Sequence, residues 1–385
     1  MKICFISMSS STNQDGASLS MLNIACELAK RGNEVVLVLS SDKNIEWIRQ
    51  KEHIKCYIVP AYSMRINILK RRKSTGIKFF IKYMFNYFYM LKAYKILKNE
   101  NVDLIHINGL NHQMGAQIAD KLGIPYVWHI RQLMEEDLGQ TIFAKNKVWK
   151  YVKKADAVIA ISNTVKNKFE KEFHRKIVTV YNGVPIEKYE VEDKDIFNSE
   201  TAKLILPGRI DPGKGQMDAV KAIEELKVNR KINTELYIVG NIEDRTYEQR
   251  IRTYIDKKNL DSNIHILHYV ADLRKLRKQC DIGLTCSKNE AFGRVTIENQ
   301  LAGLLVIGAN TGGTTEIIKD NETGLLYKEG DYMDLADKIE YAIINKNTMR
   351  NIANHGKDNA IDQFSIERVV DQLIGIYENC KMQRG

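Results

Sequence analysis

Long hydrophobic runs are missing from this sequence of 385 residues, and cysteine and proline are scarce. A helix that spans a membrane needs about 20 apolar residues, whereas the longest apolar run in the basic part of the chain, 83–91, has nine residues and includes an asparagine. The first residues, MKICFIS, lack the extended apolar stretch and cleavage site of a signal peptide. The six cysteines form no C-x-x-C pair. We therefore expect a cytoplasmic protein with reduced thiols.

Acidic side chains are absent from one long segment. No Asp or Glu occurs between Glu52 and Glu100, and the same window contains eleven Lys and Arg residues. These eleven charges exceed the formal net charge of +10, so the remainder of the chain is close to neutral. A chain that is basic throughout, as in many nucleic-acid coats, is excluded, and no DNA- or RNA-binding motif accompanies the segment. We therefore expect no nucleic-acid partner.

Short apolar runs alternate with helical patterns along almost the whole chain. Most of these runs are continuous, which is typical of parallel strands buried on both faces, and a polar, acidic stretch at 187–200 separates two such arrays. The pattern predicts an α/β protein with two tandem Rossmann-like domains, 1–188 and 189–365, facing a ligand cleft. Residues 366–385 are expected to form a helix that packs back toward the first domain. The expected strands are 2–7, 34–39, 54–59, 104–108, 125–130, 157–161 and 177–181, then 203–207, 235–239, 264–267, 281–285 and 304–307.

The most informative motif is the loop and helix start at 287–298, S-K-N-E-A-F-G-R-V-T-I-E. Glycine at the start of a helix allows a phosphate to approach the exposed backbone N–H groups. Glu290 and Glu298 are eight residues apart, about 12 Å along a helix, which is wider than the carboxylate pair of a glycosidase. We interpret them as two contacts to one long ligand. The alternative is a loop glutamate and a solvated helix glutamate without a function.

A second glycine-rich loop, 208–215, follows an expected strand in the same domain. Arg209 and Lys214 project there from the carboxyl end of the sheet, where two cations can neutralise a departing diphosphate. The string also fits G-x4-G-K, but Gly215 stands where a phosphate loop needs Ser or Thr to hold magnesium, which disfavours an NTPase. The alternative is an Arg and a Lys at an ordinary surface turn.

The third loop contains Gly312 and Gly313 and again lies between a strand and a helix. It offers flexible backbone donors, and the alternative is a simple turn with Thr314 as the N-cap. Two patterns that could hold a metal are weak. Asp193 and Asp195 form a D-x-D string in the acidic linker, and His265-x-x-His268 has no third ligand nearby.

The three loops together resemble the C-terminal half of the retaining GT-B glycosyltransferases of family 4. The similarity covers 203–327 in order and spacing, together with Y-N-G-V-P at 181–185. It implies that Arg209 and Lys214 bind the diphosphate of a nucleotide sugar, that Glu290 contacts the donor sugar, and that Glu298 holds the ribose hydroxyls. The donor-binding residues that it implies are Gly16, Arg209, Lys214, Glu290, Phe292, Gly293, Glu298, Gly313 and Thr314, and the catalytic ones are Arg209, Lys214, Glu290 and His129.

The first domain resembles the family more loosely. Gly16 would lie near the phosphate or the acceptor, and His129 would meet the donor sugar at the reaction centre. Taken alone, His129 could equally be a core histidine at the end of a strand. The sequence departs from the family pattern at 15–18, which lacks the acid of G-G-x-E, and at 240–242, where G-N-I replaces G-D-G. These departures concern the acceptor and the base rather than the diphosphate.

The resemblance implies a retaining transfer from a nucleotide-diphosphate sugar, expected to be a UDP-sugar, to a glycan or lipid-linked saccharide in bacterial cell-surface polysaccharide synthesis. No cofactor and no essential metal are expected. Two other functions remain open. A nucleotide-sugar epimerase would consume the donor without an acceptor, and a non-catalytic nucleotide-sugar-binding protein would bind it without turnover.

The basic segment predicts a helix over 79–98 with two distinct faces. One stripe of apolar side chains is expected to pack on the core. The opposite face combines lysines with aromatic rings, which suits an anionic membrane surface on the inner face of the cell membrane; a solvated charged face is the alternative. The expected core stripe is Phe80, Tyr83, Met84, Tyr87, Leu91 and Tyr94. The expected membrane or acceptor surface is Lys70, Arg71, Arg72, Lys73, Lys78, Lys82, Phe85 and Tyr89.

Overall fold

The computed structural model describes residues 1–7, 16–42, 45–68, 75–110, 113–136, 139–192 and 194–384. The chain forms two compact units. The first contains Met1–Val184 together with Ile366–Gly385, and the second contains Pro185–Ser365. The division between Val184 and Pro185 lies near the boundary at 188 expected from the sequence.

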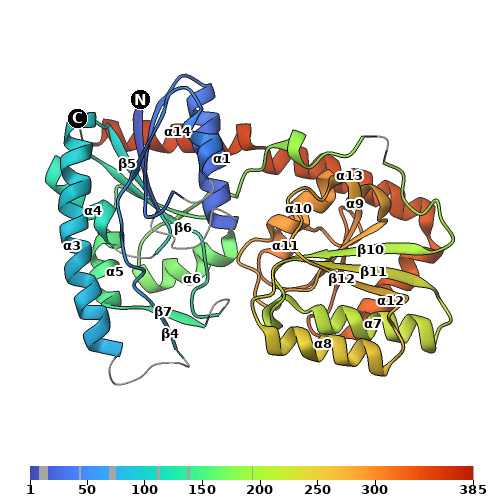
Figure 1. Ribbon diagram of the computed structural model, residues 1–385. Coiled ribbons are helices and arrows are strands. Elements are labelled where there is room, and N and C mark those ends of the chain that lie inside the picture. The colour runs from blue at the N-terminus through green and yellow to red at the C-terminus, as the bar shows by residue number, and fades with distance from the viewer. Residues whose placement is uncertain are drawn as a thin grey trace. The chain divides into compact units, whose positions relative to one another are not determined.

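A seven-stranded sheet forms the centre of the first unit, in the order β3-β2-β1-β5-β6-β8-β9 (Figure 1). All of its neighbouring strands pair in parallel. Helix α1 packs against α14, and α3 packs against α4. The strands are β1 (Lys2–Ser7), β2 (Glu34–Leu39), β3 (Ile54–Ile58), β5 (Leu104–Asn108), β6 (Tyr126–Ile130), β8 (Ala157–Ala160) and β9 (Val178–Thr179), with a separate antiparallel pair of β4 (Arg65–Asn67) and β7 (Gln140–Ile142). The helices are α1 (Gly16–Lys30), α2 (Glu46–Arg49), α3 (Thr75–Glu100), α4 (Met114–Leu122), α5 (Lys145–Lys154), α6 (Asn163–Phe173) and α14 (Ile366–Met382).

The second unit is built around a six-stranded parallel sheet in the order β12-β11-β10-β13-β14-β15. Strands β10, β13 and β14 are neighbours in this sheet. The strands are β10 (Ala202–Pro207), β11 (Thr234–Val239), β12 (Ile264–Leu267), β13 (Ile282–Thr285), β14 (Leu305–Ala309) and β15 (Leu325–Tyr327). The helices are η1 (Ile186–Lys188), η2 (Pro212–Lys214), α7 (Gln216–Val228), α8 (Arg245–Lys257), α9 (Arg274–Gln279), α10 (Arg294–Leu301), α11 (Thr314–Ile317), α12 (Tyr332–Ile344) and α13 (Lys346–Phe364).

The continuous apolar runs are central strands, as their pattern predicts. Every residue of β5 and β6 in the first unit, and of β13 and β14 in the second, is buried. A strand covered by helices on both faces has no solvated side, so it needs no alternation of polar and apolar residues. The α/β class with two Rossmann-like units is confirmed. Strands β4, β7 and β15 were not predicted, because they are only three residues long.

Helix α14 closes the first unit although it follows the second unit in the sequence. It begins at Ile366, whose backbone N–H donates to the carbonyl of Val184 at 3.1 Å. A Cβ on Gly183 would lie 2.9 Å from the Cα of Ile366, so only glycine permits this approach. Arg31, the residue after α1, pairs with Asp371 and donates to the carbonyl of Glu367 at 2.9 Å. These contacts hold α14 against α1.

The expected core stripe of the basic helix is wrong. The buried residues of α3 are Phe79, Asn86, Met90, Ala93 and Leu97, whereas Phe80, Met84 and Tyr87 are exposed. The reason is Asn86, whose side chain accepts from the Tyr62 backbone N–H at 2.8 Å and donates to the Tyr62 carbonyl at 2.9 Å. These two hydrogen bonds satisfy a buried amide, so a polar residue turns inward and aromatic residues turn outward.

Candidate active site

Three loops meet at one edge of the second sheet. They follow β10, β13 and β14, which are adjacent and parallel, so their carboxyl ends lie side by side. These loops are 208–215, 286–293 and 310–313, and they contain glycines of the three motifs that the sequence predicts to bind phosphate. In open α/β sheets this edge is the usual place for a ligand.

Glycine allows these loops to pack directly on one another. A Cβ on Gly215 would lie 2.1 Å from the carbonyl oxygen of Cys286, and one on Gly313 would lie 2.4 Å from the Cα of Phe292. The backbone N–H of Gly313 donates to the carbonyl of Glu290 at 2.8 Å, and that of Lys288 donates to Gly213 at 2.9 Å. The three loops therefore form one structure rather than three independent turns.

Lys214 and Glu290 form the central ion pair of this edge. Lys214 Nζ lies 2.8 Å from Glu290 Oε2, and both side chains are largely buried. Lys214 ends η2, whose N-cap, Asp211, accepts from the backbone N–H of Gly213 at 2.9 Å. Burial by itself would raise the pKa of Glu290, but the Lys214 ammonium, a hydrogen bond from Ser287 and the charge of Arg209 lower it overall. Glu290 is therefore an ionised carboxylate at neutral pH.

Arg209 is an exposed cation beside this pair. It is the second residue after β10, and its carbonyl accepts from the side chain of Gln216 at 2.7 Å. Its guanidinium Nη2 lies 3.8 Å from Asp211 Oδ2, which is a long and loosely held ion pair. The structure thus brings Arg209, Lys214 and Glu290 to the same edge, as the sequence predicts, while their roles toward a ligand remain predictions.

Glu298 lies on α10 and is held by two arginines. Its carboxylate oxygens lie 3.0 Å from Arg277 Nη2 and 3.0 Å from Arg294 Nη2. Arg294 also donates to the Tyr189 hydroxyl at 2.7 Å, and burial, with Glu298 nearby, raises the pKa of Tyr189 to about 12. Of the two arginines, only Arg294 could have been found from the sequence, because it precedes Glu298 by four residues on one helix face.

The N-cap residues of α10 and α11 at this edge are glycines, not threonines. Gly293, with φ of 103°, is the N-cap of α10, and the adjacent Phe292 is buried with its ring centroid 5.8 Å from that of Phe364. Gly313 is the N-cap of α11, so the alternative that Thr314 caps this helix is wrong. Thr314 is the first residue of α11 and is fully buried.

In the first unit, His129 lies in β6 and is fully buried. Its Nδ1 is 3.2 Å from Nε2 of His106, whose Nδ1 is 2.7 Å from the Tyr377 hydroxyl of α14. Burial and the nearby charge of Arg131 hold the pKa values of both histidines well below their usual range. Both rings are therefore neutral, and this histidine chain (Tyr377, His106, His129) was not predicted.

The expected proton positions on His106 and His129 depend on the direction of the hydrogen bond between the Tyr377 hydroxyl and His106. The described residues offer the Tyr377 hydroxyl no acceptor other than His106, so we expect Tyr377 to donate to His106. In that arrangement a neutral His106 donates to His129 Nδ1, and His129 carries its proton at Nε2. Among the described residues, His129 Nε2 has no hydrogen-bond partner.

Two further residues of the first unit concern the prediction of the site: Gly16 was predicted to belong to it, and Arg131 was not. Gly16, predicted to lie near phosphate or acceptor, opens α1, and its carbonyl accepts from Ser20 Oγ at 2.8 Å; residues 8–15 before it lie outside the described residues. Arg131, which sequence reasoning missed, is buried and donates from Nε to Asn108 at 2.8 Å. It also hydrogen-bonds Asn182, in the Y-N-G-V-P run.

Comparison with protein families decides the classification. The family described as "Glycosyltransferase Family 4" matches residues 14–188, and that described as "Glycosyl transferases group 1" matches 188–359. The chain belongs to glycosyltransferase family 4.

This glycosyltransferase is similar to proteins from bacteria and archaea. An uncharacterized glycosyltransferase of Methanocaldococcus jannaschii is 29% identical, over 75% of this chain and 80% of its own. The Campylobacter jejuni enzyme named GalNAc-alpha-(1->4)-GalNAc-alpha-(1->3)-diNAcBac-PP-undecaprenol alpha-1,4-N-acetyl-D-galactosaminyltransferase is 22% identical over 99% of both chains. The crystal structure of Anabaena HepE in complex with UDP and glucose has a TM-score of 0.78 and 21% identity, covering 97% of this chain and 98% of that one. This structural likeness shows the GT-B fold.

The two weak metal patterns do not form a site in the part of the chain that the structure describes. No group of three or more His, Cys, Asp or Glu residues that could hold a metal ion occurs there. Asp195 pairs with Arg350 at 3.0 Å, and its D-x-D partner Asp193 lies outside the described residues. The ring of His265 lies 4.9 Å from that of Tyr237.

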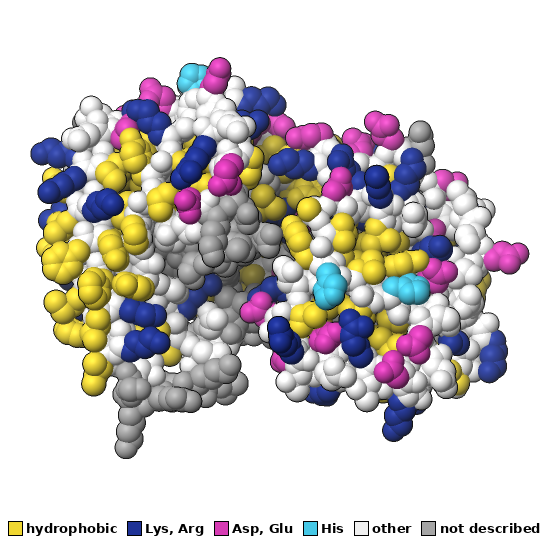
Figure 2. Space-filling model, viewed as in Figure 1, with side chains coloured by type: hydrophobic (Ala, Val, Ile, Leu, Met, Phe, Trp, Pro, Cys, Tyr) yellow, Lys and Arg dark blue, Asp and Glu magenta, His cyan; other side chains and the backbone are white. Residues whose placement is uncertain are grey.

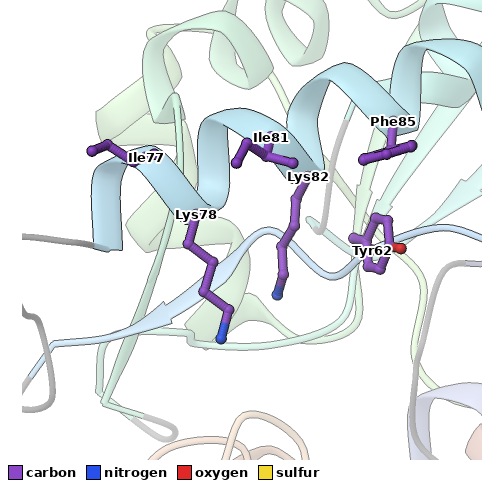
Figure 3. Close-up of a pocket in the computed structure, with 6 residues that line it drawn as sticks. All are labelled: Tyr62, Ile77, Lys78, Ile81, Lys82 and Phe85. Atoms are coloured by element: carbon purple, nitrogen blue, oxygen red, sulfur yellow. The ribbon is translucent and has the colours of Figure 1, made fainter.

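The predicted membrane surface is only partly described. Lys70, Arg71, Arg72 and Lys73 lie outside the described residues. Lys78, Lys82 and Phe85 line a groove along α3 (Figure 3), while Tyr89 is half-buried against Tyr62, with ring centroids 6.1 Å apart. Within the described ranges, no helix has the length and apolar character needed to cross a membrane.

Proposed function

We propose that this glycosyltransferase moves a sugar from a nucleotide-diphosphate sugar to a glycan or lipid-linked saccharide, with retained anomeric configuration, in bacterial cell-surface polysaccharide synthesis. The observation that carries the proposal is the convergence of Arg209, Lys214 and Glu290 on three interlocked loops. A UDP-sugar is proposed because the similar HepE structure contains UDP and glucose. The acceptor class is proposed because the name of the C. jejuni relative contains a saccharide joined through PP to undecaprenol.

In the proposed complex, the cations of the second unit bind the diphosphate. Lys214 is held in place by Glu290 before any ligand arrives, so its charge is preorganised for the negative charge that develops on the leaving group. Arg209, exposed and loosely paired, is the second cation. The Glu290 carboxylate accepts hydrogen bonds from hydroxyls of the donor sugar, and the N-terminus of α10 favours the phosphates. Glu298 accepts from the ribose hydroxyls.

The proposed reaction is a front-face displacement, as the family resemblance implies. The acceptor oxygen forms a bond to the anomeric carbon while the bond from that carbon to the diphosphate oxygen breaks. The diphosphate leaves with the electron pair and takes the acceptor proton. The chain's own residues stabilise this leaving group through Arg209 and Lys214, without a metal in the proposal.

The decisive experiment combines donor binding with turnover. A panel of UDP- and GDP-sugars is scored by thermal shift, where a cognate donor at 100 times its Kd adds about 2.7 kcal/mol to the free energy of unfolding. Transfer is then measured with that donor and a lipid-linked saccharide, for the wild type and for Glu290→Gln. We expect the variant to lose about 100-fold in turnover, since it lacks one preorganised charge. Near-normal turnover would contradict the assignment.

The matched control for this variant is Glu224→Gln. Glu224 also pairs with a lysine, Lys258, at 2.6 Å in the second unit, but it does not belong to the three loops. It should leave turnover unchanged.

Three further measurements separate the finer parts of the proposal. NMR of the product gives the anomeric configuration, and an inverted product would contradict retention. Full activity in excess chelator is expected, whereas complete loss would show that a metal is required. Consumption of donor without any acceptor would favour an epimerase, and tight donor binding without turnover on any acceptor would favour a binding protein.

The proposed location follows from the proposed substrates. Nucleotide sugars are water-soluble metabolites of the cytoplasm, whereas the saccharide of a lipid-linked acceptor lies at a bilayer surface. An enzyme that uses both must work where they meet, so we place it at the inner face of the cell membrane.

A further inference from the structure

The first half of α3 exposes large apolar side chains on the side away from the sheet. Ile77 is 71% exposed and Phe88 is 61% exposed, and Ile81 and Met84 are each 50% exposed. At 100° per residue these four positions fall within about 60° of one another, opposite the buried Phe79 face. We call Ile77, Ile81, Met84 and Phe88 the outer apolar face. Figure 2 shows hydrophobic side chains gathered along this outer edge of the first unit.

A groove runs beside the outer apolar face and is bordered by lysines. It has a volume of about 460 Å³ and is formed by Tyr62 with Ile77, Ile81 and Phe85 of α3. In Figure 3 the side chains of Lys78 and Lys82 extend from the helix along this groove. Lys82 is half-buried, and its Nζ lies over the ring of Phe79, 4.7 Å from the centroid, so this ammonium group packs on the wall of the groove.

The surroundings of the outer apolar face are basic. Lys92 and Lys95 are exposed on the later turns of α3, and no Asp or Glu occurs in the chain between Glu52 and Glu100. The neighbouring helices add lysines: Lys147 of α5 lies 5.0 Å from the ring of Tyr83, and Lys121 of α4 lies 6.0 Å from that of Tyr94. Helix α5 itself contains five lysines and no acidic residue.

This charge identifies the occupant of the face. A second copy of the chain packed on the same face would bring two lysine-rich surfaces together, and like charges across an interface oppose association. A bilayer that contains anionic lipids offers the complementary surface, with acyl chains for the apolar residues and phosphates for the ammonium groups.

We propose that α3 lies in the plane of an anionic membrane, with its outer apolar face in the headgroup region and the exposed Lys78, Lys92 and Lys95 on lipid phosphates. Reversible attachment of this kind needs two signals, one apolar and one electrostatic, and α3 carries both. The proposal rests on the proposed membrane location and names the surface that achieves it. The apolar residues proposed here to enter the membrane differ from those of the sequence prediction, which placed Met84 in the core stripe of the helix.

The test is co-sedimentation of the full chain with vesicles of phosphatidylcholine alone and with 30% phosphatidylglycerol. We expect binding to the anionic vesicles that weakens as salt is raised, and little binding to the neutral ones. The variant Ile81→Gln/Met84→Gln/Phe88→Gln should lose at least about 20-fold in affinity for anionic vesicles, because it removes three buried side chains from the bilayer contact. Gln is a good helix former, so the circular dichroism and melting temperature should match the wild type.

Matched variants separate the apolar and the charged contributions. Val228→Gln/Tyr341→Gln/Ile344→Gln makes the same change at exposed positions of the second unit and should bind vesicles like the wild type. Lys78→Gln/Lys92→Gln/Lys95→Gln should weaken anionic binding by about fivefold per lysine and flatten the dependence on salt.

Three outcomes would overturn the proposal. They are equal binding to neutral and anionic vesicles, unchanged binding by the α3 triple variant, and a concentration-dependent dimer in sedimentation velocity that the triple variant abolishes. Because vesicle binding is measured without donor or acceptor, it is independent of the transferase proposal. The triple variant should also transfer sugar to a water-soluble acceptor analogue at the wild-type rate, so a loss there would place α3 in the reaction instead.

Discussion

His129 lies in a strand of the first sheet and Lys214 in a loop at the edge of the second sheet, and the two side chains have opposite electrostatic surroundings. His129 is fully buried in a chain of neutral groups, and its pKa is held well below the usual range by burial and by Arg131. Lys214 is largely buried too, but it faces the Glu290 carboxylate at 2.8 Å. The surroundings of His129 disfavour a charged ring, whereas the charge of Lys214 is neutralised by Glu290.

The difference teaches what each centre can do with a charged ligand. A lysine already paired with a carboxylate can redirect part of its charge to a diphosphate without first being desolvated. A buried neutral histidine can only donate or accept a hydrogen bond, since protonating it would place an unpaired charge in an apolar interior. Under the proposed function, Lys214 would therefore interact with the leaving group and His129 with a neutral sugar hydroxyl.

The largest expected effect is the loss of kcat/KM when the lysine of the Lys214–Glu290 pair is removed. Lys214→Ala should lower kcat/KM for the nucleotide sugar by about 10²- to 10³-fold, because one preorganised cation is lost. Steady-state kinetics with the cognate donor checks this, and Lys258→Ala, which removes the lysine of the Glu224 pair, should behave like the wild type. Equal losses in both variants would mean that Lys214 acts through folding rather than through the ligand.

The next effect concerns stability in the second unit. Arg277 is almost fully buried between Glu298 and Asn299, so Arg277→Met should lower the free energy of unfolding by about 3 kcal/mol by leaving Glu298 with one arginine. Urea unfolding followed by circular dichroism measures this. Arg274→Met removes an arginine from the exposed pair with Asp272 and should cause little change, so a similar loss there would contradict the expectation.

The two buried neutral histidines should make the free energy of unfolding depend on pH. Because the pKa values of His106 and His129 are lowered in the folded state, the unfolded chain binds more protons below its own histidine pKa of about 6.5. Stability is therefore complete above that pH and declines as pH falls through it, by about 2.7 kcal/mol for two histidines between pH 7.5 and 5.5.

All three tryptophans, Trp47, Trp128 and Trp149, belong to the first unit, so unfolding followed by their fluorescence reports on this unit alone. His129→Gln should halve the slope with pH. The same slope in this variant as in the wild type would show that His129 is not the group responsible.

The smallest effect tests the direction of the hydrogen bonds in the histidine chain. Tyr377→Phe removes the donor to His106 Nδ1 and should lower stability by about 1 kcal/mol. It also frees His106 to reverse, so nitrogen NMR should show the His129 proton moving from Nε2 toward Nδ1, with only a few-fold change in turnover. Tyr341→Phe, at an exposed position of the second unit, is the control. An unchanged His129 tautomer would refute the assigned direction.

The sequence predicts the sheets well because their information is local. Each of β10, β13 and β14 is a short, mostly apolar run, and a glycine occurs within eight residues after it, so the runs and the loops after them are visible without any tertiary contact. Once three such strands are parallel neighbours, Arg209, Lys214 and Glu290 must reach the same edge. The loop positions of these residues therefore followed from pattern alone.

The partners of the site residues were not predictable in this way. Arg277 precedes Glu298 by 21 residues, and Tyr377 follows His106 by 271. No periodicity relates positions so far apart, and only the packing of α9 on α10, or of α14 on the first sheet, brings them together. The same limit explains α3, where apolar residues on both faces leave the helical period without a unique inward direction.

The sequence by itself determined the α/β class, the two Rossmann-like units and the three loops, because hydrophobic runs and glycine positions act over a few residues. It also determined that the basic charge lies in one segment. Only the tertiary structure decided which face of α3 is buried, which arginines hold Glu298 and which groups lie beside His129. Each of these depends on the desolvation of a polar group by a distant partner, and burial is a property of the packed chain rather than of any local pattern.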